Sequence, residues 1–163
     1  MNHLHLFYTF DALPFWEMMD IYIEGNVENG EYFFPEKPKA QQLQLAIQKF
    51  RDYLEDDFFP RENAFCALWM EDGQYVSALR LKPWEDGLLL EALETRPDQR
   101  NQGCAFKLIN AVLREISSQK VYAHVSKSNA ASLRTLQKCG FSILRNANDG
   151  AENHRIHILL RKV

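Results

Sequence analysis

The sequence predicts an α/β protein with a central mixed, mostly antiparallel sheet flanked by helices. Three observations predict this class. Segments with helical apolar spacing alternate with short strand-like runs along the chain. Three consecutive strand-like runs between 64 and 93 are joined by short turns, which favours antiparallel pairing. The segment 88–125 contains a strand, a loop, a helix and a strand, which is expected to add a parallel pair with a right-handed crossover.

The first third of the chain is expected to be mainly helical. Residues 3–10 alternate well enough for a short strand, and Asp11 can cap a helix that follows. That helix is expected to end at the turn-forming residues Gly25, Asn26, Asn29 and Gly30. Pro35 and Pro38 are expected to keep the following segment irregular, so that 25–38 is predicted to be an irregular region. A second helix is predicted from about 39 to 55, because its apolar residues recur on one face.

The middle of the chain changes to strand-like patterning. The runs 64–70 and 75–81 are joined by Glu-Asp-Gly-Gln. Asp-Gly between two such runs indicates a tight hairpin. A turn that contains proline and glycine then leads into the third run, 88–93. The three runs are therefore expected to be neighbours in one sheet.

The last third alternates helices with strands. Residues 103–117 carry apolar side chains at the spacing of one helix face, and 121–125 is strand-like. A short helix is predicted over 129–138, ended by a glycine. Two further strands, 141–144 and 154–160, are expected around a turn. The predicted order is β-α-α-β-β-β-α-β-α-β-β.

The composition fits one ordinary globular domain spanning 1–163. Apolar residues make up 46% and charged residues 25% of the chain. Nothing approaches the run of roughly 20 apolar residues that a membrane span needs, and the first residues do not resemble a signal peptide. We therefore expect a cytoplasmic protein with no membrane partner. The net charge of −3 argues against nucleic acid as the partner and suits a cationic small molecule or peptide.

The cysteines and histidines do not suggest a disulfide framework or a metal site. Cys66, Cys104 and Cys139 lie far apart without CxxC spacing, which favours free thiols. The histidines lack cysteines or carboxylates at ligand spacing, so no metal is expected. A homodimer is compatible with the sequence, which does not determine the oligomeric state.

A polar loop joins the strand 88–93 to the helix 103–117. Pro97 breaks the chain, and the loop leads directly into the helix start. The first N–H groups of a helix have no intrahelical partners and lie at the positive end of the helix dipole. Phosphate is the usual occupant of such a position. The loop therefore predicts an anion site.

Two motifs resemble those of the GNAT family of N-acetyltransferases. Arg-Asn-Gln-Gly-Cys-Ala at 100–105 resembles the family's R/Q-x-x-G-x-G/A loop, and it also lies between a strand and a helix. The segment Asn129 to Ile143 is similar to the second signature, a helix that begins at Asn and ends in Gly-Phe. Because the element order is also that of the family, the resemblance covers the whole chain and implies the GNAT fold.

The resemblance implies acetyl-CoA as the acyl donor and a primary amine of a small molecule or peptide as the acceptor. It assigns the cofactor's pyrophosphate to the loop residues Arg100, Asn101, Gln102, Gly103, Cys104 and Ala105. Leu93 and Thr95 match the positions whose backbone pairs with the pantetheine arm. Asn129 and Ser132 match the start of the helix that holds this arm, and a simple helix cap is the alternative role of Asn129.

Acetyl transfer to an amine needs a group that removes a proton, because amines with a pKa near 10 are mostly protonated at neutral pH. Glu91 is the first candidate, since a carboxylate on the apolar strand Leu-Leu-Leu-Glu requires a reason. Glu94 is the second candidate. A solvent-facing position on the strand is the alternative for each. A backbone N–H, at Leu93 or Thr95, is expected to polarise the thioester carbonyl.

One departure from the family pattern leaves the proton donor open. Relatives often carry a tyrosine seven residues after the Asn, where it can protonate the departing thiolate; Leu136 stands there in this chain. Tyr122 and His124, on one face of the strand 121–125, are alternative donors. The reaction could also proceed without a dedicated acid. Leu136 further keeps open a non-catalytic CoA-binding regulatory domain of the same fold.

Overall fold

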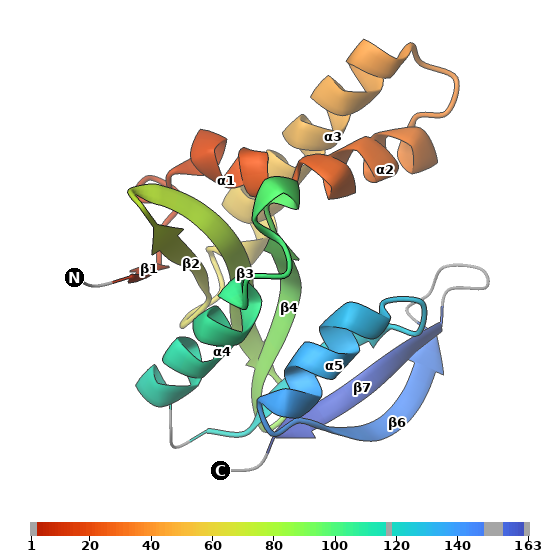
Figure 1. The fold of residues 1–163 in the computed structure, drawn as a ribbon. Helices are drawn as coiled ribbons and strands as arrows, with labels where there is room; N and C mark the ends of the chain where they lie inside the picture. Colours follow the sequence, from red (N-terminus) through yellow and green to blue (C-terminus); the bar gives the residue numbers. More distant parts are fainter. Residues whose placement is uncertain (1–2, 117–118, 149–154, 162–163) are drawn as a thin grey trace.

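A computed structural model describes residues 3–116, 119–148 and 155–161 and shows a seven-stranded sheet with helices on both faces (Figure 1). The strand order is β1-β2-β3-β4-β5-β7-β6. β4 and β5 pair in parallel, and the other neighbouring strands pair antiparallel. The predicted fold class is confirmed. The strands are β1 (Leu4–Phe7), β2 (Phe65–Glu71), β3 (Gln74–Trp84), β4 (Gly87–Thr95), β5 (Val121–Ser126), β6 (Ser142–Asn148) and β7 (Arg155–Arg161).

The helices form two layers, one on each side of the sheet (Figure 1). The first layer contains α1 (Phe15–Ile21), α2 (Ile23–Phe33) and α3 (Lys39–Tyr53), and the second contains α4 (Cys104–Glu115) and α5 (Ala130–Lys138). Two short helical turns, η1 (Leu54–Phe58) and η2 (Pro97–Gln99), complete the elements. Residue 117, the predicted end of α4, and residue 154, the predicted start of β7, lie outside the described residues.

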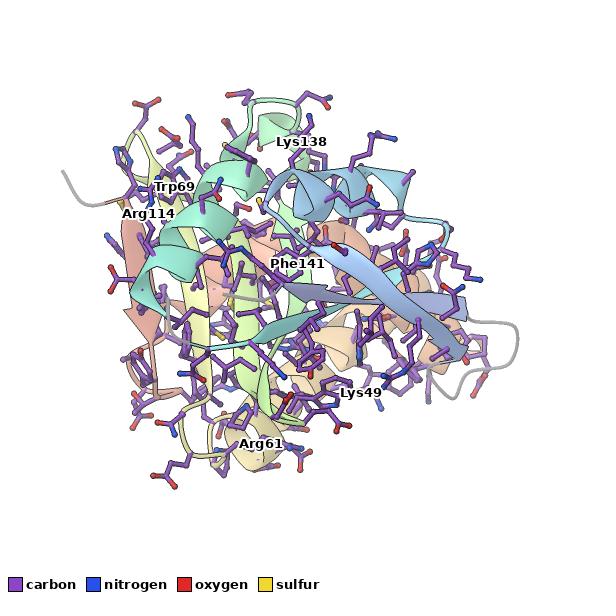
Figure 2. All side chains as sticks on the ribbon, turned by 90° about the horizontal axis from the view of Figure 1, so that it is seen from below. Lys49, Arg61, Trp69, Arg114, Lys138 and Phe141 are labelled. Atoms are coloured by element: carbon purple, nitrogen blue, oxygen red, sulfur yellow. The ribbon has the colours of Figure 1, made fainter. Side chains whose placement is uncertain are left out.

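Each helical layer covers its own apolar core. Alternation along β2 separates the two, because Phe65 and Ala67 belong to the core under α4 and α5, whereas Cys66 and Leu68 belong to the core under α1 and η1. Figure 2 shows side chains filling the space between α5 and the sheet, with Phe141 among them. Burial of each large apolar side chain contributes about 1.5–3 kcal/mol. The central strands are therefore held from both faces.

Residues 25–33 are helical, which corrects the sequence prediction for this part of the segment 25–38, whereas residues 34–38 are irregular as predicted. The chain bends at Tyr22 and then continues as α2 through Phe33. Gly30 lies against α3, because a Cβ atom built on it would stand 2.6 Å from the backbone oxygen of Gln42. Asn26, one turn earlier in the helix, is buried, with 1% of its surface exposed. These residues permit two helices to approach closely and do not end a helix.

Gly30→Ala is expected to destabilise the protein by about 1–3 kcal/mol, because the added methyl group overlaps the backbone of α3. Gly25→Ala is the matched control in the same helix, since no atom of the described residues lies within 4 Å of the position that its Cβ would take. The control should stabilise by up to about 1 kcal/mol through helix propensity. Urea unfolding measures both changes. Equal stabilisation by the two substitutions would contradict the packing role of Gly30.

Candidate functional site

β4 separates from β5 halfway along its length. The parallel pairing runs from Leu88 opposite Val121 to Leu90 opposite Ala123. On the other side of β4, the pairs Arg80–Glu91 and Ala78–Glu94 leave two β4 residues opposite one β3 residue, which is a β-bulge. Ala92 in this bulge has a positive φ of 56°. The second half of β4 therefore has backbone groups on its β5 side that β5 does not pair.

A hydrogen bond from the first helical layer holds the bulge. The Tyr22 hydroxyl donates to the backbone oxygen of Ala92 at 2.6 Å, and Tyr22 is 6% exposed. Burial raises the pKa of this phenol far above its ordinary value, so the hydroxyl remains a donor at any physiological pH. The bulge is thus fixed at the point where β4 leaves β5.

A cavity of about 870 Å³ lies between the end of β4, the loop into α4, α5 and α2. It brings together residues that the sequence assigned to the cofactor from three separate segments. Those that line it are Leu93, Thr95, Arg100, Asn101, Gly103, Cys104, Ala105, Asn129 and Ser132. Glu94 lines it as well, whereas Gln102, Glu91 and Tyr122 are not among its lining residues.

The start of α4 presents backbone N–H groups to this cavity. Gly103 is the N-cap residue, with a left-handed φ of 76°, and no side chain in the described part of the chain caps the helix. The first helical hydrogen bond of this turn runs from the Lys107 N–H to the Gly103 oxygen. A Cβ at position 103 would meet no described atom within 4 Å. Gly103, Cys104, Ala105 and Phe106 all line the cavity, so this uncapped helix start lies at its wall, and the arrangement fits a pyrophosphate.

Asn129 forms the cap that the sequence offered as its alternative role. Its Oδ1 accepts a hydrogen bond from the backbone N–H of Ser132 at 3.1 Å. Both residues also line the cavity, so the first turn of α5 forms the wall opposite the loop. Contact with a cofactor arm remains a prediction for both.

The cavity carries charge of both signs. The Arg100 guanidinium lies 2.9 Å from Glu24 and 3.8 Å from Glu94, and Glu28 lines the same wall. Burial raises the pKa of Glu94 above its ordinary value; Arg100 opposes this rise, and the carboxylates of Glu24 and Glu28 add to it. Glu94 is therefore a carboxylate of the cavity that holds a proton more readily than an ordinary glutamate.

Glu91 and Glu94 pair with Arg80 and Ala78 of β3 and so lie on the same side of the sheet, which the first helical layer covers, but Glu91 has a different environment. Arg80 and Lys82 lie 3.0 and 3.4 Å from its Oε1, and the Tyr53 hydroxyl donates to the same oxygen at 3.4 Å. Burial alone would raise the pKa of Glu91, but Arg80 and Lys82 together lower it below its ordinary value. The Arg80 guanidinium also stacks 4.9 Å from the centre of the Tyr53 ring. This placement favours Glu94 over Glu91 as the proton acceptor.

Glu91→Gln is expected to cost about 1–3 kcal/mol of stability, because Arg80 would lose its charged partner in a largely buried position. The folded-state pKa of Glu91 is lowered, so its contribution is present at neutral pH and is lost as the pH falls below its unfolded value. Denaturant unfolding at neutral and acidic pH measures this. Glu55→Gln, which breaks an exposed helix pair with Arg51, is the control and should change stability by less than about 0.5 kcal/mol.

The alternative proton donors lie on the strand face where they were predicted, but outside the cavity lining. Tyr122 donates its hydroxyl to Asp86 at the turn between β3 and β4, and Trp84 packs against both Tyr122 and His124. Burial lowers the pKa of His124. Leu136 is 1% exposed and belongs to the core under α4 and α5. The structure therefore brings no donor to the cavity from these positions.

Sequence reasoning missed four charged residues of the cavity, which are Glu24, Glu28, Arg134 and Lys138. Each pair is spaced i, i+4, which places both members on one helix face. Because the sequence predicts an irregular segment over 25–38, the i, i+4 spacing of Glu24 and Glu28 does not indicate a shared helix face there. For Arg134 and Lys138 the helix was predicted, so their common face was the available signal.

Two further findings concern metals and membranes. Within the described ranges, no group of three or more His, Cys, Asp or Glu residues is arranged to hold a metal ion. No helix in the described part of the chain is both long and apolar enough to cross a membrane.

Comparison with known proteins identifies the family. The model of the acetyltransferase (GNAT) family matches residues 25–141. No curated protein sequence matches the chain. Several solved structures share the fold at low identity. An IAA acetyltransferase from Bacillus cereus is 11% identical, with 98% of each chain covered and a TM-score of 0.65.

Two other structures share the fold. A GNAT-family acetyltransferase from Bacillus cereus is 16% identical, with 99% of this chain and 98% of that chain covered and a TM-score of 0.62. The PaiA N-acetyltransferase from Thermoplasma acidophilum, solved with coenzyme A, is 13% identical, with both chains fully covered and a TM-score of 0.61. The family match spans most of the chain, and this protein therefore belongs to the GNAT acetyltransferase family.

Proposed function

We propose that the protein is an N-acetyltransferase that moves an acetyl group from acetyl-CoA directly to a primary amine of a small molecule or peptide. The observation that carries this proposal is the cavity in which an uncapped helix start, an unpaired strand edge and a half-buried carboxylate meet. Family membership and the CoA complex of the PaiA structure support the choice of donor.

The residues of the cavity fit CoA in two places. The N–H groups at the start of α4, with Arg100, would hold the pyrophosphate. The β5-facing backbone of β4 around Leu93 and Thr95 would pair with the pantetheine arm, because the pairing with β5 ends at Leu90. Acetyl-CoA supplies a thioester, which is an activated acetyl group.

Glu94 would prepare the acceptor. An ammonium group cannot attack a carbonyl carbon, so a base must first remove a proton. Glu94 lines the cavity with a raised pKa, which makes it a better proton acceptor than an ordinary carboxylate. A backbone N–H at Leu93 or Thr95 would stabilise the negative charge that develops on the carbonyl oxygen. No side chain is assigned to protonate the leaving thiolate.

A non-catalytic CoA-binding domain is the second candidate, and Leu136 favours it. This residue stands where relatives carry a tyrosine, and its side chain is buried in the core. Calorimetric titration with CoA and thiol release from acetyl-CoA with a panel of polyamines, amino acids and peptides separate the two functions. Release that depends on the amine supports the transferase. CoA binding with no release above background for any amine would support the binding domain.

A further inference from the structure

Arg100, the cation of the phosphate loop, already has anionic partners within the protein. Its Nη2 lies 2.9 Å from the Glu24 carboxylate of α2 and 3.8 Å from the Glu94 carboxylate of β4. All three side chains line the cavity and are partly exposed to solvent. The ion pair therefore joins three segments that are distant in sequence, namely the second helix, the bulged strand and the loop.

These contacts compete with the binding of a phosphate. A guanidinium has five donors fixed in one plane, and a pyrophosphate that binds the edge containing Nη2 would take the donor that Glu24 now occupies. Three carboxylates line the loop side of the cavity, from Glu24, Glu28 and Glu94, and Arg100 pairs with two of them. An incoming anion therefore meets negative charge unless Arg100 turns towards it.

We propose that Arg100 exchanges partners when CoA binds, moving from Glu24 and Glu94 to the pyrophosphate, so that Glu24 acts as an internal competitor for the phosphate site. This inference rests on the proposed function, because the ligand is CoA. It makes Glu24 and Arg100 determinants of donor specificity. A thioester donor without a pyrophosphate, such as S-acetylpantetheine, has no group that releases Arg100.

The exchange also affects Glu94. Arg100 opposes the rise in the pKa of Glu94, while Glu24, Glu28 and burial raise it. Departure of Arg100 raises this pKa further, and Glu94 becomes a stronger base only after the donor has bound. CoA binding is then accompanied by proton uptake at mildly acidic pH, and Glu94→Gln removes that uptake. Calorimetry in buffers of different ionisation enthalpy measures it.

A double-mutant cycle tests the exchange by calorimetric titration with CoA at constant ionic strength. Glu24→Gln is expected to tighten CoA binding about two- to fivefold, the usual strength of an exposed ion pair. Arg100→Gln is expected to weaken it about tenfold, through the loss of a charged hydrogen bond. In the Arg100→Gln background, Glu24→Gln should keep only the general charge effect that Glu28→Gln shows, because the competition requires the guanidinium.

Glu28→Gln is the matched control. It removes the same charge from the same helix and cavity, so it reports the general effect of charge on an anionic ligand, which does not depend on Arg100. Tighter binding in Glu24→Gln that persists undiminished without Arg100, or that Glu28→Gln reproduces in full, would overturn the exchange. No measurable binding of CoA by the unmodified protein would overturn the proposed function, and the exchange with it.

Discussion

Gly103→Trp is expected to lower CoA affinity more than about 100-fold. Gly103 lines the cavity at the N-cap of α4, and no atom of the described residues lies within 4 Å of the position its Cβ would take. An indole would therefore extend into the space in front of the helix N–H groups, where the pyrophosphate is proposed to bind. The left-handed φ of 76° adds a backbone cost of about 1–2 kcal/mol. Calorimetric titration with CoA measures the loss.

Gly73→Trp separates the effect on the site from the backbone cost. Gly73 has nearly the same φ, 77°, and the same free space around its Cβ position, but it lies in the turn between β2 and β3, away from the cavity lining. Both variants should lose similar stability in urea, and the Gly73 variant should bind CoA normally. Normal CoA affinity in the Gly103 variant would show that the pyrophosphate binds elsewhere.

The order of strands and helices could be predicted because most of it follows from local patterns. The Asp-Gly hairpin is an example, since Asp72 and Gly73 both have positive φ in the structure, as a tight turn requires. The exception is α2. Gly30 and Asn26 are typical of helix ends when considered alone, but here one permits contact with α3 and the other is buried. Tertiary packing decided their role.

The loop of the candidate site was predictable for the same reason, because it is one continuous segment between a strand and a helix. Which of Glu91 and Glu94 lines the cavity could not be predicted, because the direction of each side chain depends on the bulge at Ala92. Without a bulge, strict alternation would place Leu90 and Leu93 on opposite faces of β4. Both pack against the same core, so the bulge shifts every later side chain by one face. Nothing in the sequence around Ala92 indicates a positive φ, so the bulge and the faces of the residues that follow it could not be predicted.

Glu94→Gln is expected to lower kcat about 100-fold, measured with an amine acceptor from the panel, while tightening CoA binding by no more than Glu24→Gln does, because Glu94 is the more distant partner of Arg100. General base catalysis commonly contributes this much, and glutamine keeps the shape of the side chain without accepting a proton. Glu94 must be ionised to act, so the rate should fall as the pH drops through the pKa of Glu94, which burial raises above that of an ordinary glutamate. The variant should lack this acidic limb.

Glu91→Gln provides the contrast that makes the assignment specific. It removes a carboxylate from the same strand, but one with a lowered pKa that is held by Arg80 and Lys82. At a temperature where this variant is folded, its acidic limb should match that of the unmodified enzyme, and Glu94→Asp should restore part of the lost rate. If the limb disappears with Glu91→Gln and survives Glu94→Gln, the proton acceptor is Glu91. In that case the free protein would present Glu94 to the cavity although Glu91 is the proton acceptor, and β4 would have to shift when the donor binds.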